Sequence, residues 1–221
     1  MRAILLFLLM TACARPMTPA ERALVAPLHG ATLDAGRVAI QTQPGLDLLP
    51  IAYDARPRVT CRERIGPPET GRVVGRTGGL VLFERLLLAP VVALPDFAAT
   101  DRDGRIDLAA AMFFVHEMTH VWQWQNRAVT GYHPLRAVGE QLTIDDPYLF
   151  DEAETRFLDH GYEVQASLVE EYLCCAVLHP DGARTHRLKR LLRQALPVAE
   201  PRRITRPATV PYAEDLDGIC A

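Results

Sequence analysis

The sequence predicts an α+β domain in which a small twisted sheet packs on two central helices. A helical run begins near residue 108 and contains no Gly or Pro before Gly131, and a second one extends from about residue 159 to residue 178. Short apolar segments suited to β-strands precede both helices, at residues 37–40, 50–53, 80–88 and 91–94. The length of 221 residues fits one domain with a substantial core.

The first twelve residues predict a signal for export. One Arg precedes an apolar run that is too short to span a membrane as a helix. Cys13 follows directly, in a context that resembles a bacterial lipobox, so we expect Cys13 to be lipidated and to become the mature N-terminus. The segment Ala12-Cys13-Ala14 also satisfies the small-x-small rule for ordinary signal peptidase, with release after Ala14. Both alternatives place the protein in the periplasm, and the lipid would anchor it to the outer membrane.

Residues 13–70 are expected to form a tether and an irregular N-terminal segment, with a short helical turn near residues 21–25. The stretch 57–68 is rich in Pro, Arg and Glu and is typical of an irregular surface segment. Residues 71–221 are expected to form the folded domain. Its last helix is predicted at about residues 184–195, with a basic face exposed to solvent.

Export changes the interpretation of the cysteines. Beyond Cys13 the chain holds Cys61, Cys174, Cys175 and Cys220, an even number in an oxidising compartment. Adjacent cysteines rarely bond to each other without strain, so we expect Cys61 and Cys220 each to join one of the neighbouring pair. A zinc site built from these thiolates is less favoured, because no C-x-x-C spacing occurs.

The charge balance argues against a nucleic-acid partner. The chain has 27 acidic and 24 basic residues and a formal net charge of −3, whereas nucleic-acid binders carry a clear basic excess. An acidic stretch at residues 101–107 is similar to a calcium loop, but Ala110 stands where such a loop needs a bidentate Glu. We therefore expect these acids to form a turn and to cap the next helix.

The sequence His116-Glu117-Met118-Thr119-His120 lies inside the first predicted helix. Residues four apart on a helix lie on one face, so His116 and His120 would present two imidazoles to one point. That spacing suits two ligands of a tetrahedral Zn²⁺ ion, and Glu117 would lie close enough to take a proton from a water at the metal. The helix is expected to begin at Asp107, a plausible N-cap.

A catalytic zinc site needs a third protein ligand and an open position. The second predicted helix offers Glu163, flanked by small or apolar residues, as the first candidate. Glu170 is the second candidate and His160, in the preceding loop, is the third. Ser167 is placed to support a histidine or the glutamate through its hydroxyl.

These residues predict a zinc-dependent hydrolase that cleaves amide bonds in a peptide or protein substrate, with Glu117 as general base. The developing oxyanion needs a further donor, and the sequence does not choose among the candidates Tyr132, His133, Tyr148 and His160. The alternative is a non-catalytic lipoprotein of the cell envelope that has a binding or structural role and in which zinc stabilises the fold.

The segment His-Glu-Met-Thr-His-Val-Trp-Gln-Trp-Gln at residues 116–125 closely resembles the signature of the bacterial Vgr-related proteins, and the H-E-x-x-H domain of contractile-injection and toxin proteins. Residues 156–172 resemble the second block of that family, in which Tyr-Gly-Leu-Glu-Gln-Gln-Ala is typical. Pro95-Asp-Phe97 is similar to a smaller motif, and the resemblance covers about residues 80–175. It implies a zincin-like, gluzincin-type metallopeptidase fold with Glu163 as the third ligand. Val164 departs from the pattern, where the family has the first Gln.

In proteases of the zincin type, the strand that precedes the metal helix lies along the cleft, where it can pair with an extended substrate. The resemblance therefore implies that the strand predicted within residues 80–88 borders the substrate site.

Overall fold

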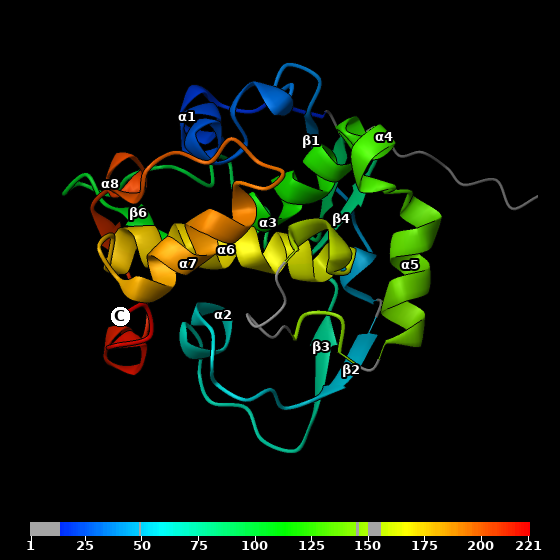
Figure 1. The fold of residues 1–221 in the computed structure, drawn as a ribbon. Coiled ribbons are helices and arrows are strands. Elements are labelled where there is room, and N and C mark those ends of the chain that lie inside the picture. The colour runs from blue at the N-terminus through cyan, green and yellow to red at the C-terminus, as the bar shows by residue number, and fades with distance from the viewer. Residues whose placement is uncertain (1–13, 49, 145, 150–155) are drawn as a thin grey trace, which may run out of the picture.

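A computed structural model describes residues 14–48, 50–144, 146–149 and 156–221. The predicted signal, residues 1–12, and Cys13 lie outside the described residues. The chain forms mixed α and β structure, as the sequence predicts (Figure 1). The helices are α1 Pro19–His29, α2 Cys61–Arg64, α3 Leu108–Gln125, α4 Arg127–Thr130, α5 Pro134–Thr143, α6 Tyr162–Leu178, α7 Ala183–Leu192 and α8 Pro201–Ile204. The strands are β1 Ala39–Thr42, β2 Pro50–Asp54, β3 Arg72–Arg76, β4 Gly79–Leu82, β5 Arg85–Leu88, β6 Ile106–Asp107 and β7 Ala208–Thr209, and short 3₁₀ turns occur at Gly30–Thr32, Leu46–Leu48, Phe157–Asp159 and Ala213–Leu216.

Helices α3 and α6 form the centre of the molecule and pack along each other (Figure 1). Both are the helices that the sequence predicts. Asp107 caps α3 by accepting a hydrogen bond from the backbone N–H of Ala110, as expected. Phe114 and Tyr172 are among the largest fully buried side chains of the core, one from each helix. Burial of both helices on nearly every side fixes them as a rigid platform.

The first turn of α6 is held by a residue from α5. Gly161 supplies no capping side chain. The carboxylate of Glu140 accepts the backbone N–H of Tyr162 instead, at 2.9 and 3.0 Å. A Cβ atom at position 161 would overlap that carboxylate, so a larger residue there would displace Glu140 from the N–H of Tyr162. Helix α5 is thereby tied to the helix that carries Glu163.

A three-stranded sheet in the order β1-β5-β4 packs on α3. Strand β1 pairs parallel to β5, and β4 pairs antiparallel to β5 with Gly79 opposite Leu88 and Leu82 opposite Arg85. In the part of the chain that the structure describes, β4 forms one edge of this sheet. The hairpin of β2 and β3 is separate, so the strand expected at 50–53 does not join the sheet on the helix.

Two expectations for extended segments were wrong. Residues 91–94 do not form a strand, because Pro90 and Pro95 flank them and the backbone turns, with Val92 and Ala93 donating to the carbonyl of Ala89. Residues 72–76, which are not among the predicted strands, form β3 and pair with β2.

The described residues between 14 and 70 do not form the irregular tether that we expected of residues 13–70. Residues 19–29 form α1, which begins with a capping box between Thr18 and Glu21 and packs on α3. Leu24 and Leu28 on α1 are fully buried, and β1 is an outer strand of the main sheet. The helix was underestimated because its buried face is defined by packing on α3 and its own apolar pattern is short.

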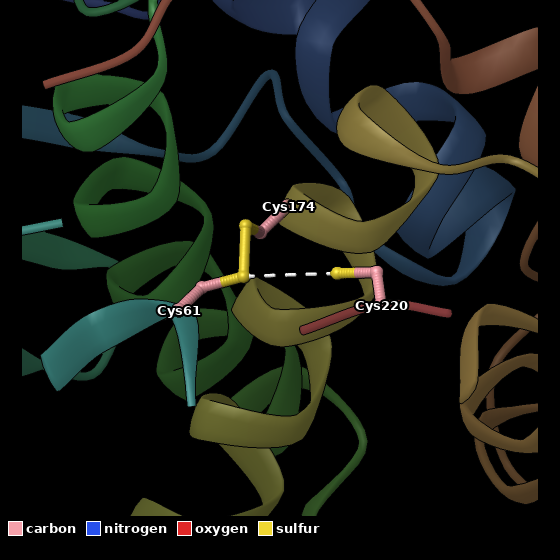
Figure 2. A group of neighbouring side chains, drawn as sticks. All are labelled: Cys61, Cys174 and Cys220. Atoms are coloured by element: carbon pink, nitrogen blue, oxygen red, sulfur yellow. Dashed lines mark hydrogen bonds between the residues drawn. A yellow bond between two sulfur atoms is a disulfide. The ribbon is translucent and has the colours of Figure 1, made fainter. Parts of the chain in front are cut away.

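The disulfides confirm the predicted partners. Cys61 bonds to Cys174 and Cys175 bonds to Cys220, so each distant cysteine joins one of the adjacent pair on α6. Figure 2 shows the first bond beside Cys220, whose sulfur lies 4.0 Å from that of Cys61. The bond of Cys61 also anchors α2, which lies inside the stretch expected to be irregular, against the central helix.

The acids at 101–107 form the predicted turn. The Asp101 carboxylate accepts the backbone N–H groups of Asp103 and Arg105 at 2.9 Å. Near the C-terminus, α7 exposes Arg187 and Arg190 as predicted, whereas Arg184 is buried and pairs with Glu171 of α6 at 2.8 Å. No helix among the described residues is long and apolar enough to cross a membrane.

Candidate metal centre

Three side chains from α3 and α6 converge on one point. The Nε2 atom of His116 lies 3.1 Å from Oε2 of Glu163, and the Nε2 atom of His120 lies 3.2 Å from the same oxygen. The two Nε2 atoms are 3.2 Å apart. The ligand set predicted from the sequence therefore forms a nearly equilateral triangle, and all three residues are buried.

The size of this triangle fits zinc. Nitrogen and oxygen ligands at 2.0–2.2 Å from a tetrahedral zinc ion are separated from one another by about 3.3 Å. The three distances here are 3.1, 3.2 and 3.2 Å. Two imidazoles and one carboxylate are also a donor set that zinc accepts. His116, His120 and Glu163 would therefore hold a zinc ion with little rearrangement.

Glu170, the second candidate ligand, lies behind His116 rather than at this point. Its Oε2 atom lies 3.0 Å from Nδ1 of His116, on the side of the ring opposite Nε2. The guanidinium of Arg62 donates two hydrogen bonds to the same carboxylate, at 2.5 and 2.7 Å. Arg62 follows Cys61, so the disulfide to Cys174 holds this arginine against α6. The guanidinium of Arg62 also lies 2.9 Å from Nδ1 of His116, so Glu170 and Arg62 together orient the ring with Nε2 toward the other two ligands.

The protonation of the histidines reflects these carboxylates. Burial opposes a charge on His120, but the negative charge and hydrogen bond of Glu163 outweigh it and raise the pKa of His120 to about 9. Burial alone would raise the pKa of Glu170, yet Arg62 and His116 lower it to about 2. The pKa of Glu163 is also lowered, because the histidines outweigh its burial. In the absence of a metal, the raised pKa values favour protonated His116 and His120, and a bound cation would displace these protons.

His120 and Glu163 have supporting partners of their own. Gln123 Oε1 lies 2.8 Å from Nδ1 of His120, and its amide donates to Gln165 Oε1 at 3.1 Å. The support comes from Gln165, so Val164 at the preceding position does not remove it. The expectation for Ser167 was wrong, since its buried hydroxyl finds no hydrogen-bond partner in the described structure.

The remaining oxygen of the third ligand is fixed from α5. Gln141 donates its side-chain amide to Glu163 Oε1 at 2.8 Å and to the hydroxyl oxygen of Tyr148 at 2.9 Å. Glu163 is therefore restrained through Oε1 while Oε2 faces the two histidines. Oε2 is thus the carboxylate oxygen that could bind a metal ion.

Glu117 lies next to the site, under the edge strand of the sheet. A Cβ atom at Gly79 of β4 would lie 2.5 Å from Oε1 of Glu117, so the strand backbone runs directly over the carboxylate. Burial raises the pKa of Glu117 above its usual value, and the charges of His116 and His120 counteract that increase. A carboxylate with a raised pKa is suited to accept a proton near neutral pH.

Two tyrosines flank the histidines. The ring of Tyr148 lies 6.0 Å from that of His116, and the ring of Tyr132 lies 6.2 Å from that of His120. Burial, followed by the charge of Glu163, raises the pKa of both hydroxyls above the usual value. Both therefore keep their proton at neutral pH and can donate it to a hydrogen bond.

The other two candidate oxyanion donors have different roles. His133 is exposed and caps α5, because its Nδ1 accepts the backbone N–H of Leu135. His160, also the third candidate ligand, accepts a hydrogen bond from Gln165 through its backbone carbonyl and does not belong to the group of three converging ligands. Tyr132 and Tyr148 are therefore better candidates for the oxyanion donor than His133 and His160.

Sequence reasoning missed Arg62, Gly79, Gln123 and Gln141. Gln123 lies three residues after His120, a spacing that places it within reach on the same helix. Gly79 and Arg62 carry no comparable local signal, since each reaches the site through tertiary packing.

Comparisons of the chain with protein-family models, curated proteins and solved structures found no match.

Proposed function

We propose that this protein is an exported zinc-dependent metallopeptidase. The observation that carries the proposal is the triangle of His116, His120 and Glu163, with the carboxylate of Glu117 buried beside it. A carboxylate in that place is costly unless it has a chemical use or a partner. Proton transfer is such a use.

Each residue of the candidate metal centre has a distinct role in the proposed peptide hydrolysis. His116, His120 and Glu163 would hold the metal, which when bound lowers the pKa of a water molecule toward neutrality and polarises the substrate carbonyl. Glu117 would accept a proton from the attacking water on its carboxylate and deliver it to the nitrogen of the departing amine. The hydroxyl of Tyr148 or Tyr132 donates a hydrogen bond to the oxygen that gains negative charge.

Strand β4 supplies a place for an extended peptide. Its backbone passes over Glu117 at Gly79, and its outer edge pairs with no other strand in the described part of the chain. A substrate that added itself to this edge would carry its backbone past Glu117. The resemblance of residues 116–125 and 156–172 to the zincin-like family supports the same arrangement.

Export is part of the proposal. The apolar start of the chain and Cys13 favour a lipoprotein of the periplasm or outer membrane, and two disulfides are typical of an oxidising compartment. The alternative function, a non-catalytic zinc-containing lipoprotein with a binding or structural role, uses the same metal ligands but gives Glu117 no task.

Zinc content and hydrolysis test the two functions separately. Elemental mass spectrometry after exhaustive dialysis should find about one zinc per chain in the signal-free protein and in an exposed control, Glu214→Ala, with a large loss in Glu163→Ala. Absence of zinc from the parent protein would reject the metal centre. Glu117→Gln should keep zinc and lose hydrolysis of a peptide mixture by at least about 100-fold. Full zinc without hydrolysis in the parent would favour the non-catalytic alternative.

A further inference from the structure

An exposed aromatic pair lies at the far end of the edge strand. The ring of Phe83, which follows β4, lies 4.6 Å from the ring of Trp124 near the end of α3. Phe83 is 47% exposed and Trp124 is partly exposed. The guanidinium of Arg127 stacks 4.3 Å from the centre of the Trp124 ring and holds it in place. The aromatic pair is therefore an ordered apolar surface that is exposed to solvent.

The aromatic pair is aligned with the general base. Trp124 follows Glu117 by seven residues, which is two helical turns, so both lie on nearly the same face of α3 and about 10.5 Å apart along its axis. Phe83 follows Gly79 by four residues, about 13 Å along an extended chain. Since Gly79 covers Glu117 and Phe83 contacts Trp124, β4 runs alongside α3 from one contact to the other.

The backbone at Phe83 is unfavourable for this residue type. Leu82 pairs with Arg85, so Phe83 and Glu84 form a two-residue hairpin turn. Phe83 has a φ of 62°, a left-handed conformation that favours glycine at this position of such a turn. A bulky residue in that conformation costs free energy, and such costs cluster at functional sites. The turn itself gives no reason for an aromatic side chain.

We propose that Phe83 and Trp124 form an apolar subsite for the peptide substrate. The subsite receives an aromatic or large aliphatic side chain, three to four residues away from the bond that is hydrolysed. This inference rests on the proposed peptidase function, because the substrate is taken to pair with the edge of β4. The alternative is that no substrate side chain binds the aromatic pair, in which case the two rings only cover the end of the core.

The first test is the cleavage profile. The zinc-loaded protein is incubated with a randomised dodecapeptide mixture, and the products are identified by mass spectrometry. The parent should enrich Phe, Tyr, Trp and Leu at least fivefold at a position three to four residues from the cleaved bond. Phe83→Gly should reduce that enrichment to below twofold among the products that it still forms, and it should preserve the hairpin, since glycine accepts the turn. Phe83→Tyr should restore the enrichment.

A matched control comes from an exposed apolar residue outside β4. Val74 of the separate β2–β3 hairpin is 67% exposed, so Val74→Ala removes exposed apolar surface without changing β4 or the aromatic pair. Its profile should equal that of the parent. An unselective parent, or a Phe83→Gly variant that keeps the full enrichment, would overturn the subsite.

A second measurement separates the subsite from the chemistry. Trp122 is buried and Trp124 is partly exposed, so a ligand that contacts the pair changes the protein's fluorescence mainly through Trp124. In Glu117→Gln, the peptide Gly-Gly-Phe-Gly-Gly should give a saturable change that Gly-Gly-Ala-Gly-Gly does not give and that Phe83→Gly abolishes. Selective binding without any cleavage by the parent would keep the subsite and reject the peptidase. Equal responses to both peptides would reject the subsite whether or not the parent cleaves.

Discussion

Replacement of Gly79 by alanine is the most specific perturbation of the proposed general base. The new Cβ atom would lie 2.5 Å from Oε1 of Glu117 and 2.8 Å from its carboxyl carbon. An ordinary contact begins at 3.4 Å, so the carboxylate must withdraw by about 0.9 Å. A misplacement of about 1 Å can lower a catalytic rate by about 100-fold, which corresponds to about 2.7 kcal/mol in the barrier. The metal ligands are not in this contact.

We therefore expect Gly79→Ala to lower kcat by 10- to 100-fold, as an order of magnitude, while zinc content and the unfolding midpoint stay near those of the parent. Steady-state hydrolysis, elemental analysis and denaturant unfolding measure the three quantities. Gly78→Ala is the matched control, because a Cβ at that position meets its nearest neighbours at an ordinary 3.6 Å. Full activity in Gly79→Ala, or an equal loss in Gly78→Ala, would refute the reasoning. Combined with Glu117→Gln, the change should add no further loss.

Three further outcomes are expected. Glu170→Gln should weaken zinc binding by about 10- to 100-fold in a competition assay, because it removes the charge that orients the His116 ring; unchanged affinity would contradict that role. His29 is buried, and burial lowers its pKa to about 4, so the unfolded state takes up this proton at a higher pH than the folded state does. The free energy of unfolding should therefore fall by about 3 kcal/mol as the pH drops from 6.5 to 4. His29→Gln should remove this dependence in denaturant titrations. The Cys61→Ser/Cys174→Ser variant opens a loop of 113 residues and should lose about 5 kcal/mol of stability, and zinc affinity as well once Arg62 is released. Serine variants of the other disulfide should lose about 4 kcal/mol and keep zinc affinity.

Local chemistry made the central features predictable. The spacing of His116 and His120 determines their common face in any regular helix, and the capping residue Asp107 is visible beside the apolar run. Glu163 could be ranked first from its apolar neighbours and from the resemblance to a family block. The disulfide partners followed from the strain between adjacent cysteines and from an even count.

The remaining features depend on contacts between segments far apart in the chain. Glu170 was a reasonable ligand candidate, because it lies on the same helical face as Glu163 about two turns away. Only the packing shows that its carboxylate lies behind His116 and is paired with Arg62, which is 108 residues away. The contribution of α1 was underestimated for a related reason, since its buried face is defined by α3 and not by its own short pattern.

The geometry around the metal ligands favours catalysis over a structural role. A structural zinc site closes its coordination with a fourth protein ligand, whereas a catalytic site leaves one position for water or substrate. Among the described residues, the group at this point contains only His116, His120 and Glu163. Of two further carboxylates nearby, Glu170 pairs with Arg62 and Glu117 lies beneath the backbone of β4. A zinc ion held as proposed would therefore keep a position for water or substrate, with Glu117 and β4 beside its ligands, as hydrolysis of an extended peptide requires.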